Sequence, residues 1–378
     1  IHPGYGFLSE KADFVKMVED EEIGFVGPSS EHIRRMGDKI EAKRIAQSAG
    51  VPTVPGSDGV VTEFDEALEV AKQTGFPLLI KAAAGGGGRG MRVVESEDTL
   101  EKDLNEIMNE AQSAFNDSSV YIERFLTDIR HIEIQVLADG ENAIALGERD
   151  CTSQRRNQKL IEEAPSPAID DELRAGLQEA AINLCKEVGY KNAGTVEFVF
   201  DNIERKYYFI EMNTRIQVEH PVTEMITGVD LIQEQLRIAS GQKLRLTQDD
   251  VQIRGHAIEC RINAEDPNEN FAPRPGKIEN YRAPGGFGVR MDTHIESGYT
   301  IPPFYDSMVG KLICWAEDRD AAIERTLRAL DELTVDGVVT TGPFQAYLLN
   351  SEQFRSGDIN TGYVAKVLES VNEIPTEE

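Results

Sequence analysis

AGTVEFVFDNIERKYYFIEMN, residues 193–213, contains two apolar segments with strand-like alternation, separated by a polar turn. If the two strands pair as a hairpin, Glu197 lies opposite Ile210 or Glu211, depending on the register. With Glu211 opposite, the two carboxylates share one face and repel each other unless a cation lies between them. Oxygen ligands without a nearby His or Cys favour Mg²⁺ or Mn²⁺. The hairpin therefore predicts a metal site.

The polar alternation continues beyond the second strand. The residues of one parity are all polar: Glu211, Asn213, Arg215, Gln217 and Glu219. A straight strand would spread them over roughly 26 Å at about 3.3 Å per residue, so the chain must curve if all five serve one site. The alternative is an ordinary solvated strand face.

A glycine loop lies between two further predicted strands. Residues 77–82 form an apolar strand that contains Lys81, and Gly85, Gly86, Gly87 and Gly88 follow before the next strand at residues 91–95. Consecutive glycines expose backbone N–H groups that can hold phosphate oxygens. Walker A and dinucleotide-binding loops both lead into a helix, whereas this loop leads into a strand. The pattern favours a flexible lid over phosphates, and the alternative is a mobile surface hairpin.

Helical and strand patterns alternate along the chain, which predicts an α/β (α+β) architecture. The predicted helices span residues 9–22, 29–49, 64–74, 98–115, 171–188, 230–240 and 319–333. The predicted strands, besides those above, span residues 23–27, 120–125, 132–138 and 143–150.

Length and composition exclude several classes of protein. The 378 residues are enough for two or three domains, and the formal net charge of −28 argues against a nucleic-acid partner. No apolar run approaches the roughly 20 residues of a membrane span and no leader is evident, so we expect no membrane partner and a cytoplasmic location. The four cysteines form no C-x-x-C pair, which argues against a zinc site. The acidity is typical of an acidic enzyme or of adaptation to high salt.

Residues 211–224, EMNTRIQVEHPVTE, resemble the signature of biotin carboxylases, which belong to the ATP-grasp superfamily, and of the equivalent domains of acetyl-CoA, propionyl-CoA and pyruvate carboxylases. The resemblance extends over essentially the whole chain, through residues 2–10, the glycine loop, 149–156, 261–266 and 305–308. It implies an ATP-grasp fold with four parts. These are a remnant of a Rossmann-like N-terminal domain at 1–27, a helical linker at 28–52, a lid at 53–125, and a large mixed-sheet catalytic and C-terminal region at 126–378. Because residue 1 lies within a family motif, we expect the N-terminal domain to be truncated.

The resemblance also implies the reaction. ATP would phosphorylate bicarbonate, and the carboxyphosphate formed would yield CO₂ for N1′ of biotin. The implied ATP contacts are Lys39, Lys81, the loop Gly85, Gly86, Gly87 and Gly88, Glu123, Leu126, His131, Gln154 and Glu197. Glu197, Glu211 and Asn213 would hold Mg²⁺ (or Mn²⁺), and Lys159, Arg215, Gln217 and the backbone of Val218 would bind bicarbonate. Glu219 would act as the general base, Arg290 would stabilise the biotin enolate, and Tyr5 would lie near the biotin ring.

Three positions depart from the family pattern. Asn157 stands where His is usual, Arg124 stands where Lys is common, and residues 359–362 lack a His found in some relatives. The chain also has no Ala-Met-Lys-Met biotinylation sequence, so biotin would be carried by a biotin carboxyl carrier protein. The resemblance also implies a carboxyltransferase as a second partner and a homodimer as the assembly. Two alternatives remain: an ATP-grasp ligase with another acceptor, such as half of a carbamoyl phosphate synthetase, and a non-catalytic nucleotide-binding scaffold.

Overall fold

A computed structural model describes residues 1–83 and 90–371 of the chain. The predicted phosphate loop at Gly85, Gly86, Gly87 and Gly88 lies outside the described residues. The chain forms two compact units. The larger consists of Ile1–Val51, Ile129–Tyr207 and Glu211–Glu378, and the smaller consists of Pro52–Asp128 with Tyr208–Ile210.

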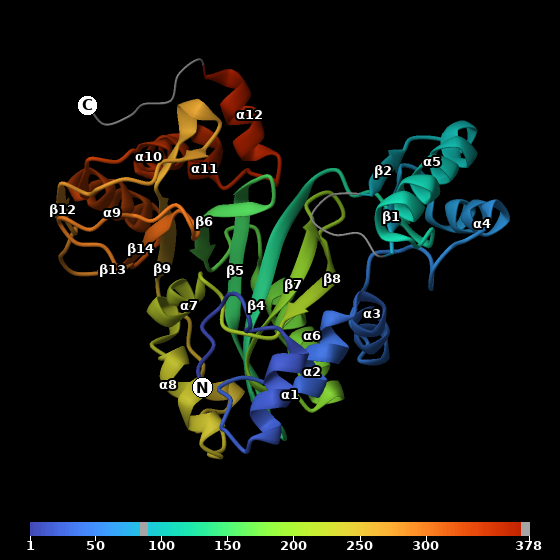
Figure 1. Cartoon of the computed structure of the whole chain (residues 1–378), viewed down its shortest axis with the longest axis horizontal. Helices are drawn as coiled ribbons and strands as arrows, with labels where there is room; N and C mark the ends of the chain where they lie inside the picture. Colours follow the sequence, from blue (N-terminus) through green and yellow to red (C-terminus); the bar gives the residue numbers. More distant parts are fainter. Residues whose placement is uncertain (84–89, 372–378) are drawn as a thin grey trace. The chain divides into compact units, whose positions relative to one another are not determined.

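An eight-stranded sheet forms the centre of the larger unit (Figure 1). Its strand order is β13-β14-β9-β6-β5-β4-β7-β8, and the pairings from β13 through β7 are antiparallel. The strands are β4 (Ile129–Asp139), β5 (Ala143–Arg155), β6 (Gln158–Ala164), β7 (Lys191–Asp201), β8 (Lys206–Asn213), β9 (His256–Asn263), β13 (Val289–Thr293) and β14 (Met308–Ala316). The predicted hairpin is thus confirmed, because β7 and β8 are neighbours in this sheet.

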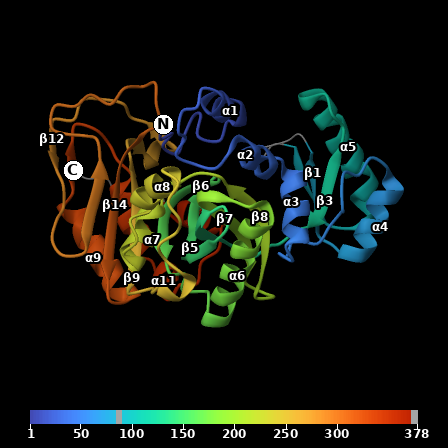
Figure 2. The same cartoon turned by 90° about the horizontal axis from the view of Figure 1, so that it is seen from below.

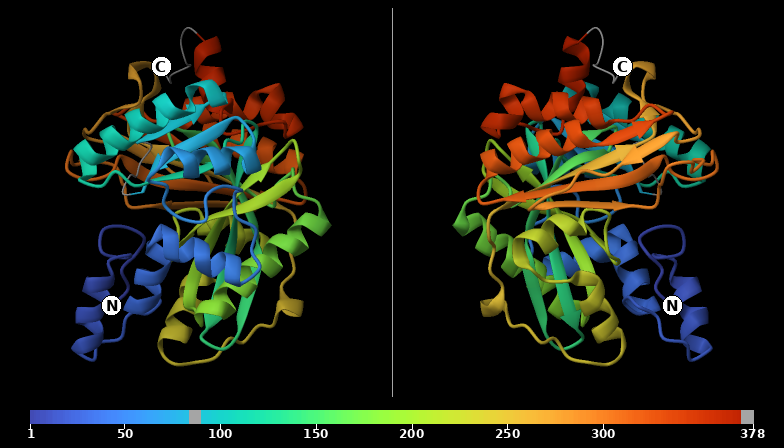
Figure 3. Two further views of the ribbon diagram at one scale, coloured as in Figure 1. Left: turned by 90° about the vertical axis from the view of Figure 1, so that its right-hand side faces the viewer. Right: turned by 90° about the vertical axis from the view of Figure 1, so that its left-hand side faces the viewer.

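Helices cover both faces of the sheet. Alternate residues of β9 point to opposite faces: Ile258 and Cys260 belong to the core beneath α9 (Arg319–Glu332), whereas Ala257 packs with α7 (His220–Thr227). Figure 3 shows the resulting layers, with α9 and its neighbours on one side of β13 and β14 and α7 on the other. Helix α6 (Asp171–Val188) packs along β5 and β4 (Figure 2), and α8 (Leu231–Ala239) packs on β7.

Shorter elements complete the larger unit. They are α1 (Ala12–Asp20), α2 (Ser30–Gly37), α3 (Lys39–Ser48), α10 (Gly342–Asn350), α11 (Glu352–Ser356), α12 (Tyr363–Ser370), the 3₁₀ helices η1 (Gln248–Asp250) and η2 (Pro267–Glu269), and the strands β10 (Glu265–Asp266), β11 (Ala272–Pro273), β12 (Asn280–Arg282) and β15 (Thr334–Asp336). The strand predicted at residues 23–27 is wrong. Within the described chain, this segment exchanges backbone hydrogen bonds only with Ile1 and with the end of α1, which do not form a ladder.

The smaller unit is a three-stranded antiparallel sheet with two helices. Its strand order is β2-β1-β3. The elements are β1 (Leu78–Ala82), β2 (Met91–Val94), β3 (Val120–Arg124), α4 (Phe64–Thr74) and α5 (Glu97–Phe115). Leu78 and Ile80 of β1 and Leu100 and Leu104 of α5 are fully buried or nearly so, which gives the unit a core of its own.

The cysteines and the helix lengths bear on the expectations from composition. All four cysteines are buried free thiols: Cys151, Cys185, Cys260 and Cys314. None of the described helices is both long enough and apolar enough to cross a membrane.

Candidate active site

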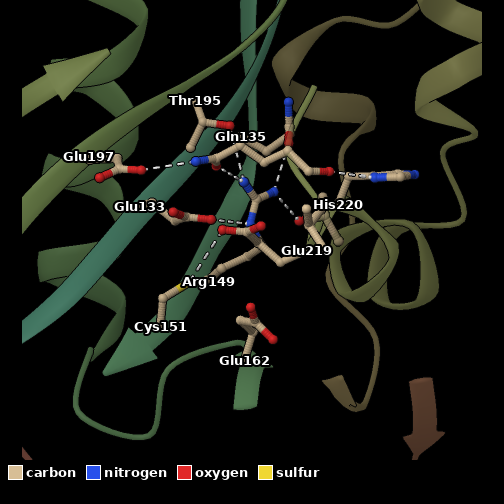
Figure 4. Close-up of polar contacts among 12 residues, drawn as sticks. Glu133, Gln135, Arg149, Cys151, Glu162, Thr195, Glu197, Glu219 and His220 are labelled. Carbon is tan, nitrogen blue, oxygen red and sulfur yellow. Dashed lines mark hydrogen bonds and ion pairs between the residues drawn. The ribbon is translucent and has the colours of Figure 1, made fainter. Parts of the chain in front are cut away.

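Arg149 lies at the centre of a buried polar network in the larger unit (Figure 4). The side chain is fully buried, and its Nε donates to Glu133 Oε1 at 2.5 Å. The other two nitrogens donate to side chains of β4, β7, the segment after β8, and α7: Gln135, Thr195, Gln217 and Thr223. The strand register places Arg149 opposite Glu133, and Glu133 opposite Glu197. Three adjacent strands thus present charged groups in one row.

Lys159 joins three carboxylates of this network. Its Nζ lies 2.6 Å from Glu133 Oε2, 2.5 Å from Glu219 Oε1 and 3.4 Å from Glu197 Oε1. Burial opposes the positive charge, but the surrounding negative groups raise the pKa of Lys159 well above its usual value. Lys159 is therefore a permanently charged ammonium group at neutral pH.

Glu219 is a buried carboxylate at the position that precedes α7. It accepts hydrogen bonds from Lys159 and, at 3.0 Å, from Arg261. Burial would raise the pKa of Glu219, but Lys159, Arg261 and Arg149 hold it well below its usual value. Glu219 is thus ionised at neutral pH.

The polar alternation after β8 converges on Glu197. Strand β8 ends at Asn213, and the chain bends at Arg215 before α7 begins. Asn213 Nδ2 and Gln217 Nε2 both donate to Glu197 Oε1, at 2.6 and 2.9 Å. Arg215 donates to Asn213 Oδ1 and forms an ion pair with Glu10. These alternate residues therefore come together because the strand ends at Asn213 and the chain then bends.

Glu211 has the surroundings of a cation ligand. Its side chain accepts no hydrogen bond from the described residues, and burial and the charge of Glu197 raise its pKa. Lys39, at the start of α3, and His131 both lower the pKa of Glu211 electrostatically. A divalent cation at this position would relieve the repulsion between the two carboxylates, so the donor set fits a magnesium ion.

His131 and Gln154 lie beside the same cluster. His131 Nε2 is 3.0 Å from Glu197 Oε2, and the ligand atoms of His131, Glu133 and Glu197 all lie within 4.8 Å of one another. Gln154 is the cross-strand partner of Lys159. Asn157 occupies the tight turn that follows, with a φ of 65°, a conformation that Asn tolerates better than most residues.

Arg290 pairs with two carboxylates other than Glu219. It donates to both carboxylate oxygens of Asp292, at 2.8 and 2.7 Å, and to Glu224 at 2.6 Å. The ammonium group of Lys311 links this group to the predicted bicarbonate segment, because it lies 3.9 Å from Asp292 and donates to the carbonyl oxygen of Val218 at 2.6 Å. The guanidinium that meets Glu219 is that of Arg261.

Tyr5 is partly exposed and lies within the electrostatic reach of this region. Burial raises the pKa of Tyr5, and Arg261 lowers it. Of the predicted contacts in the smaller unit, Lys81 pairs with Glu123 at 2.6 Å, and Leu126 is half-buried just after β3.

Family models match three consecutive stretches of the chain. They describe a biotin carboxylase N-terminal domain (residues 1–33), the ATP-binding domain of the carbamoyl-phosphate synthase L chain (38–247), and a biotin carboxylase C-terminal domain (259–366). The chain is 56% identical over 368 residues to a biotin carboxylase from Nostoc, covering 97% of this chain and 82% of the relative. The chain belongs to the biotin carboxylase family.

Other members of the biotin carboxylase family extend the comparison. A protein of Methanothermobacter thermautotrophicus that is named as part of a pyruvate carboxylase is 54% identical over 365 residues, covering 96% of this chain and 74% of that protein. The biotin carboxylase domain dimer of the Hydrogenobacter thermophilus 2-oxoglutarate carboxylase, solved with MgADP, ADP and bicarbonate, is 48% identical with a TM-score of 0.87, covering 97% of this chain and 81% of that one. A β,γ-ATP complex of the Campylobacter jejuni enzyme is 48% identical with a TM-score of 0.89, covering 97% and 82%.

Four charged residues of the site received no role from the sequence. They are Glu133, Arg149, Arg261 and Lys311. The only local signal for Glu133 is its position two residues after His131 in the same strand, which places both side chains on one face. Lys311 carries no local signal, because its contact with Val218 joins residues that are 93 positions apart.

Proposed function

We propose that this member of the biotin carboxylase family uses ATP and bicarbonate to carboxylate biotin through carboxyphosphate. The observation that carries the proposal is Glu219, a buried carboxylate kept ionised by Lys159 and Arg261 beside the fully buried Arg149. Two related structures were solved with bicarbonate bound, and one of them also holds adenine nucleotide, which supports the same chemistry here.

Bicarbonate would enter the cationic side of this cluster. We propose that Lys159, Arg215, Gln217 and the backbone of Val218 bind the anion, with Glu219 as the general base. A base with a low pKa is a weak proton acceptor, but a second anion placed beside Glu219 raises that pKa by repulsion. Binding of bicarbonate would thereby increase the basicity of the carboxylate that deprotonates it.

The residues around Glu197 would position the nucleotide and its metal ion. We propose that Glu197 and Glu211, with Asn213 beside them, hold Mg²⁺ or Mn²⁺, which when bound neutralises phosphate charge during phosphoryl transfer. Lys39, His131 and Gln154 are proposed ATP contacts of the larger unit. The smaller unit is proposed as the lid domain, and the roles of Lys81, Glu123 and Leu126 within it stay predictions.

For the residue that stabilises biotin, the structure favours a different arginine from the one that the sequence predicted. Arg261 meets Glu219 directly, whereas the carboxylates that accept from Arg290 are those of Asp292 and Glu224. We therefore propose that Arg261, in place of Arg290, is the cation that stabilises the enolate of biotin, a task that a fixed guanidinium performs well. Tyr5, which is electrostatically coupled to Arg261, stays the proposed neighbour of the biotin ring.

Membership of the biotin carboxylase family supports a proposal for the partners. We propose a biotinylated carrier protein and a carboxyltransferase as partners, and a homodimer, since one related structure is a domain dimer. Relatives named as biotin carboxylases and as part of a pyruvate carboxylase are almost equally similar to this chain. Overall identity therefore does not distinguish the final carboxyl acceptor.

Replacement of Glu219 by Gln tests the proposed function. Because an amide cannot accept the bicarbonate proton, we expect biotin-dependent ATP hydrolysis to fall by about 10²- to 10⁴-fold. Glu234→Gln is the matched control, since Glu234 of α8 is equally buried and is ion-paired with Arg245, outside this cluster. Full biotin-dependent turnover in Glu219→Gln would contradict the proposal. Ammonia-dependent turnover without biotin would favour the alternative of a carbamoyl phosphate synthetase. That alternative is the specific one to test because residues 38–247 match the ATP-binding domain of the carbamoyl-phosphate synthase L chain.

A further inference from the structure

Charged side chains from four adjacent strands share the face of the sheet that α7 covers. The register places Asp292 opposite Lys311, Lys311 opposite Arg261, and Glu259 opposite Glu162. Residues that are directly opposite in an antiparallel sheet point to the same face. The face therefore carries a mixed set of cations and carboxyl groups next to Glu219.

The cations of this face donate to acceptors other than Glu259. Arg261 donates to Glu162 Oε1 at 2.6 Å and to Glu219 Oε2 at 3.0 Å. Lys311 donates to the carbonyl oxygen of Val218. Both oxygens of Glu259 and the second oxygen of Glu162 have no hydrogen-bond partner among the described residues. The exposed fraction of both glutamates is 0%.

A fully buried carboxyl group without a donor is not expected to carry charge. The desolvation free energy of an unpaired carboxylate is so large that such groups retain their proton instead. The second carboxyl group directly opposite adds repulsion. Burial raises the pKa of Glu259 well above its usual value and that of Glu162 to about 7.

We infer that Glu259 is a neutral carboxylic acid and acts as a positioning residue for the proposed reaction. Arg261 already faces the carboxylates of Glu162 and Glu219, and a third negative charge from Glu259 would further weaken the attraction that this guanidinium offers to a substrate oxyanion. With Glu259 neutral, more of the positive charge of Arg261 acts toward the biotin side. This role rests on the proposed function of Arg261, but the neutral state of Glu259 does not.

The groups that face Glu259 come from every surrounding element. They are Glu162 of β6, Arg261 of β9, Lys311 of β14 and Glu219 before α7, with Tyr5 coupled to it electrostatically. A pKa raised on folding means that the folded protein binds a proton that the unfolded chain releases. Glu259 therefore lowers stability increasingly as the pH rises above about 4.3, the ordinary pKa of Glu.

Glu259→Gln tests the inference, because the amide reproduces a neutral carboxyl group in shape. At neutral pH we expect the Tm of the variant to equal or exceed that of the wild type, and the difference in Tm to grow with pH. Glu163→Gln is the matched control: Glu163 neighbours Glu162 in β6 and is also buried, but it accepts from His256 and Arg319. Its variant should have a lower Tm than the wild type. A comparable loss of Tm in Glu259→Gln would overturn the inference.

Infrared difference spectroscopy gives a direct readout. The carbonyl band of protonated carboxyl groups in the wild type at neutral pH should lose intensity in Glu259→Gln, and Glu162, with a pKa of about 7, should account for the remaining band. A band of undiminished intensity in Glu259→Gln would overturn the assignment to Glu259. Both this band and the Tm can be measured without turnover. The neutral state of Glu259 is therefore tested independently of the proposed carboxylation.

The role in positioning is tested by the KM for biotin. In the wild type this KM should rise at alkaline pH, by up to about tenfold for each pH unit above the pKa of Glu259, as the neutral fraction declines. In Glu259→Gln that rise should be lost. An equal alkaline rise of KM in both proteins would overturn the positioning role.

Discussion

Two arginines of the sheet face near α7 have different partners, and this difference predicts different functions. Arg261 bridges Glu162 and Glu219, whereas Arg290 binds Asp292 and Glu224. Lys cannot reproduce the forked geometry with which a guanidinium holds two acceptors. We expect Arg261→Lys to lower biotin-dependent turnover by about 10²- to 10³-fold, as loss of an oxyanion donor does elsewhere.

Arg290→Lys serves as the paired variant in this comparison. Both proteins should be assayed for biotin-dependent turnover and for the slower bicarbonate-dependent ATP hydrolysis without biotin. A larger loss of biotin-dependent turnover in Arg290→Lys than in Arg261→Lys would restore the role that the sequence first suggested for Arg290.

At the scale of residues, the sequence predicted which side chains gather around Glu197 but not what holds them. The alternation from Glu211 to Glu219 was visible because strand periodicity places alternate residues on one face. Gln217, which lies beyond the bend and donates to Glu197, also accepts one of the five hydrogen bonds by which Arg149 joins β4, β7, the segment after β8 and α7. Such contacts depend on the pairing of distant strands, which one strand's sequence does not contain.

Glu163 connects four elements of the larger unit. This residue of β6 binds His256 of β9 and Arg319 of α9, and Arg319 also donates to backbone carbonyls of α11. Burial acts in the opposite direction, but His256 and Arg319 lower the pKa of Glu163 to about 2. A lowered pKa contributes stability above the unfolded value of about 4.3, and this contribution is lost as the pH falls toward 2.

Glu163→Gln should therefore destabilise the protein in a pH-dependent way. We expect the free energy of unfolding to fall by about 3 kcal/mol at pH 7, the equivalent of losing a pKa lowered from about 4.3 to about 2, and the difference from the wild type to vanish near pH 2. Denaturant unfolding between these pH values measures it. A destabilisation that is independent of pH would show that packing, and not charge, dominates at this position.

At the scale of elements, long amphipathic helices were the best predicted. The helix predicted at residues 171–188 coincides with α6, which Asp170 caps at one end and Gly189 ends in a left-handed conformation. The strands β6, β9, β13 and β14 were not identified. β9 and β14 are buried on both faces, so they lack the alternation that marks a half-exposed strand.

The whole molecule carries a formal charge of −28, and this charge predicts its response to salt. Repulsion between exposed carboxylates disfavours the compact state, and dissolved ions screen it. Buried ion pairs such as that of Arg149 with Glu133 are screened much less. We expect the Tm to rise by a few degrees as NaCl increases from about 0.05 to about 0.3 M. Sucrose at matched osmolality is the control, and a Tm that falls with NaCl would show that attractive surface pairs outweigh the repulsion.

The burial of all four cysteines makes the chain a ready scaffold for site-directed labelling. Burial raises the pKa of Cys185 to about 12 and that of Cys314 to about 11, so thiol reagents encounter few native thiolates. Lys102 of the smaller unit and Lys206 of the larger unit have side chains that are 75% and 63% exposed. Cysteines placed at these two positions would take a fluorophore pair or spin labels without removal of any native thiol. Energy transfer between the labels could then follow the distance between the two units during nucleotide turnover.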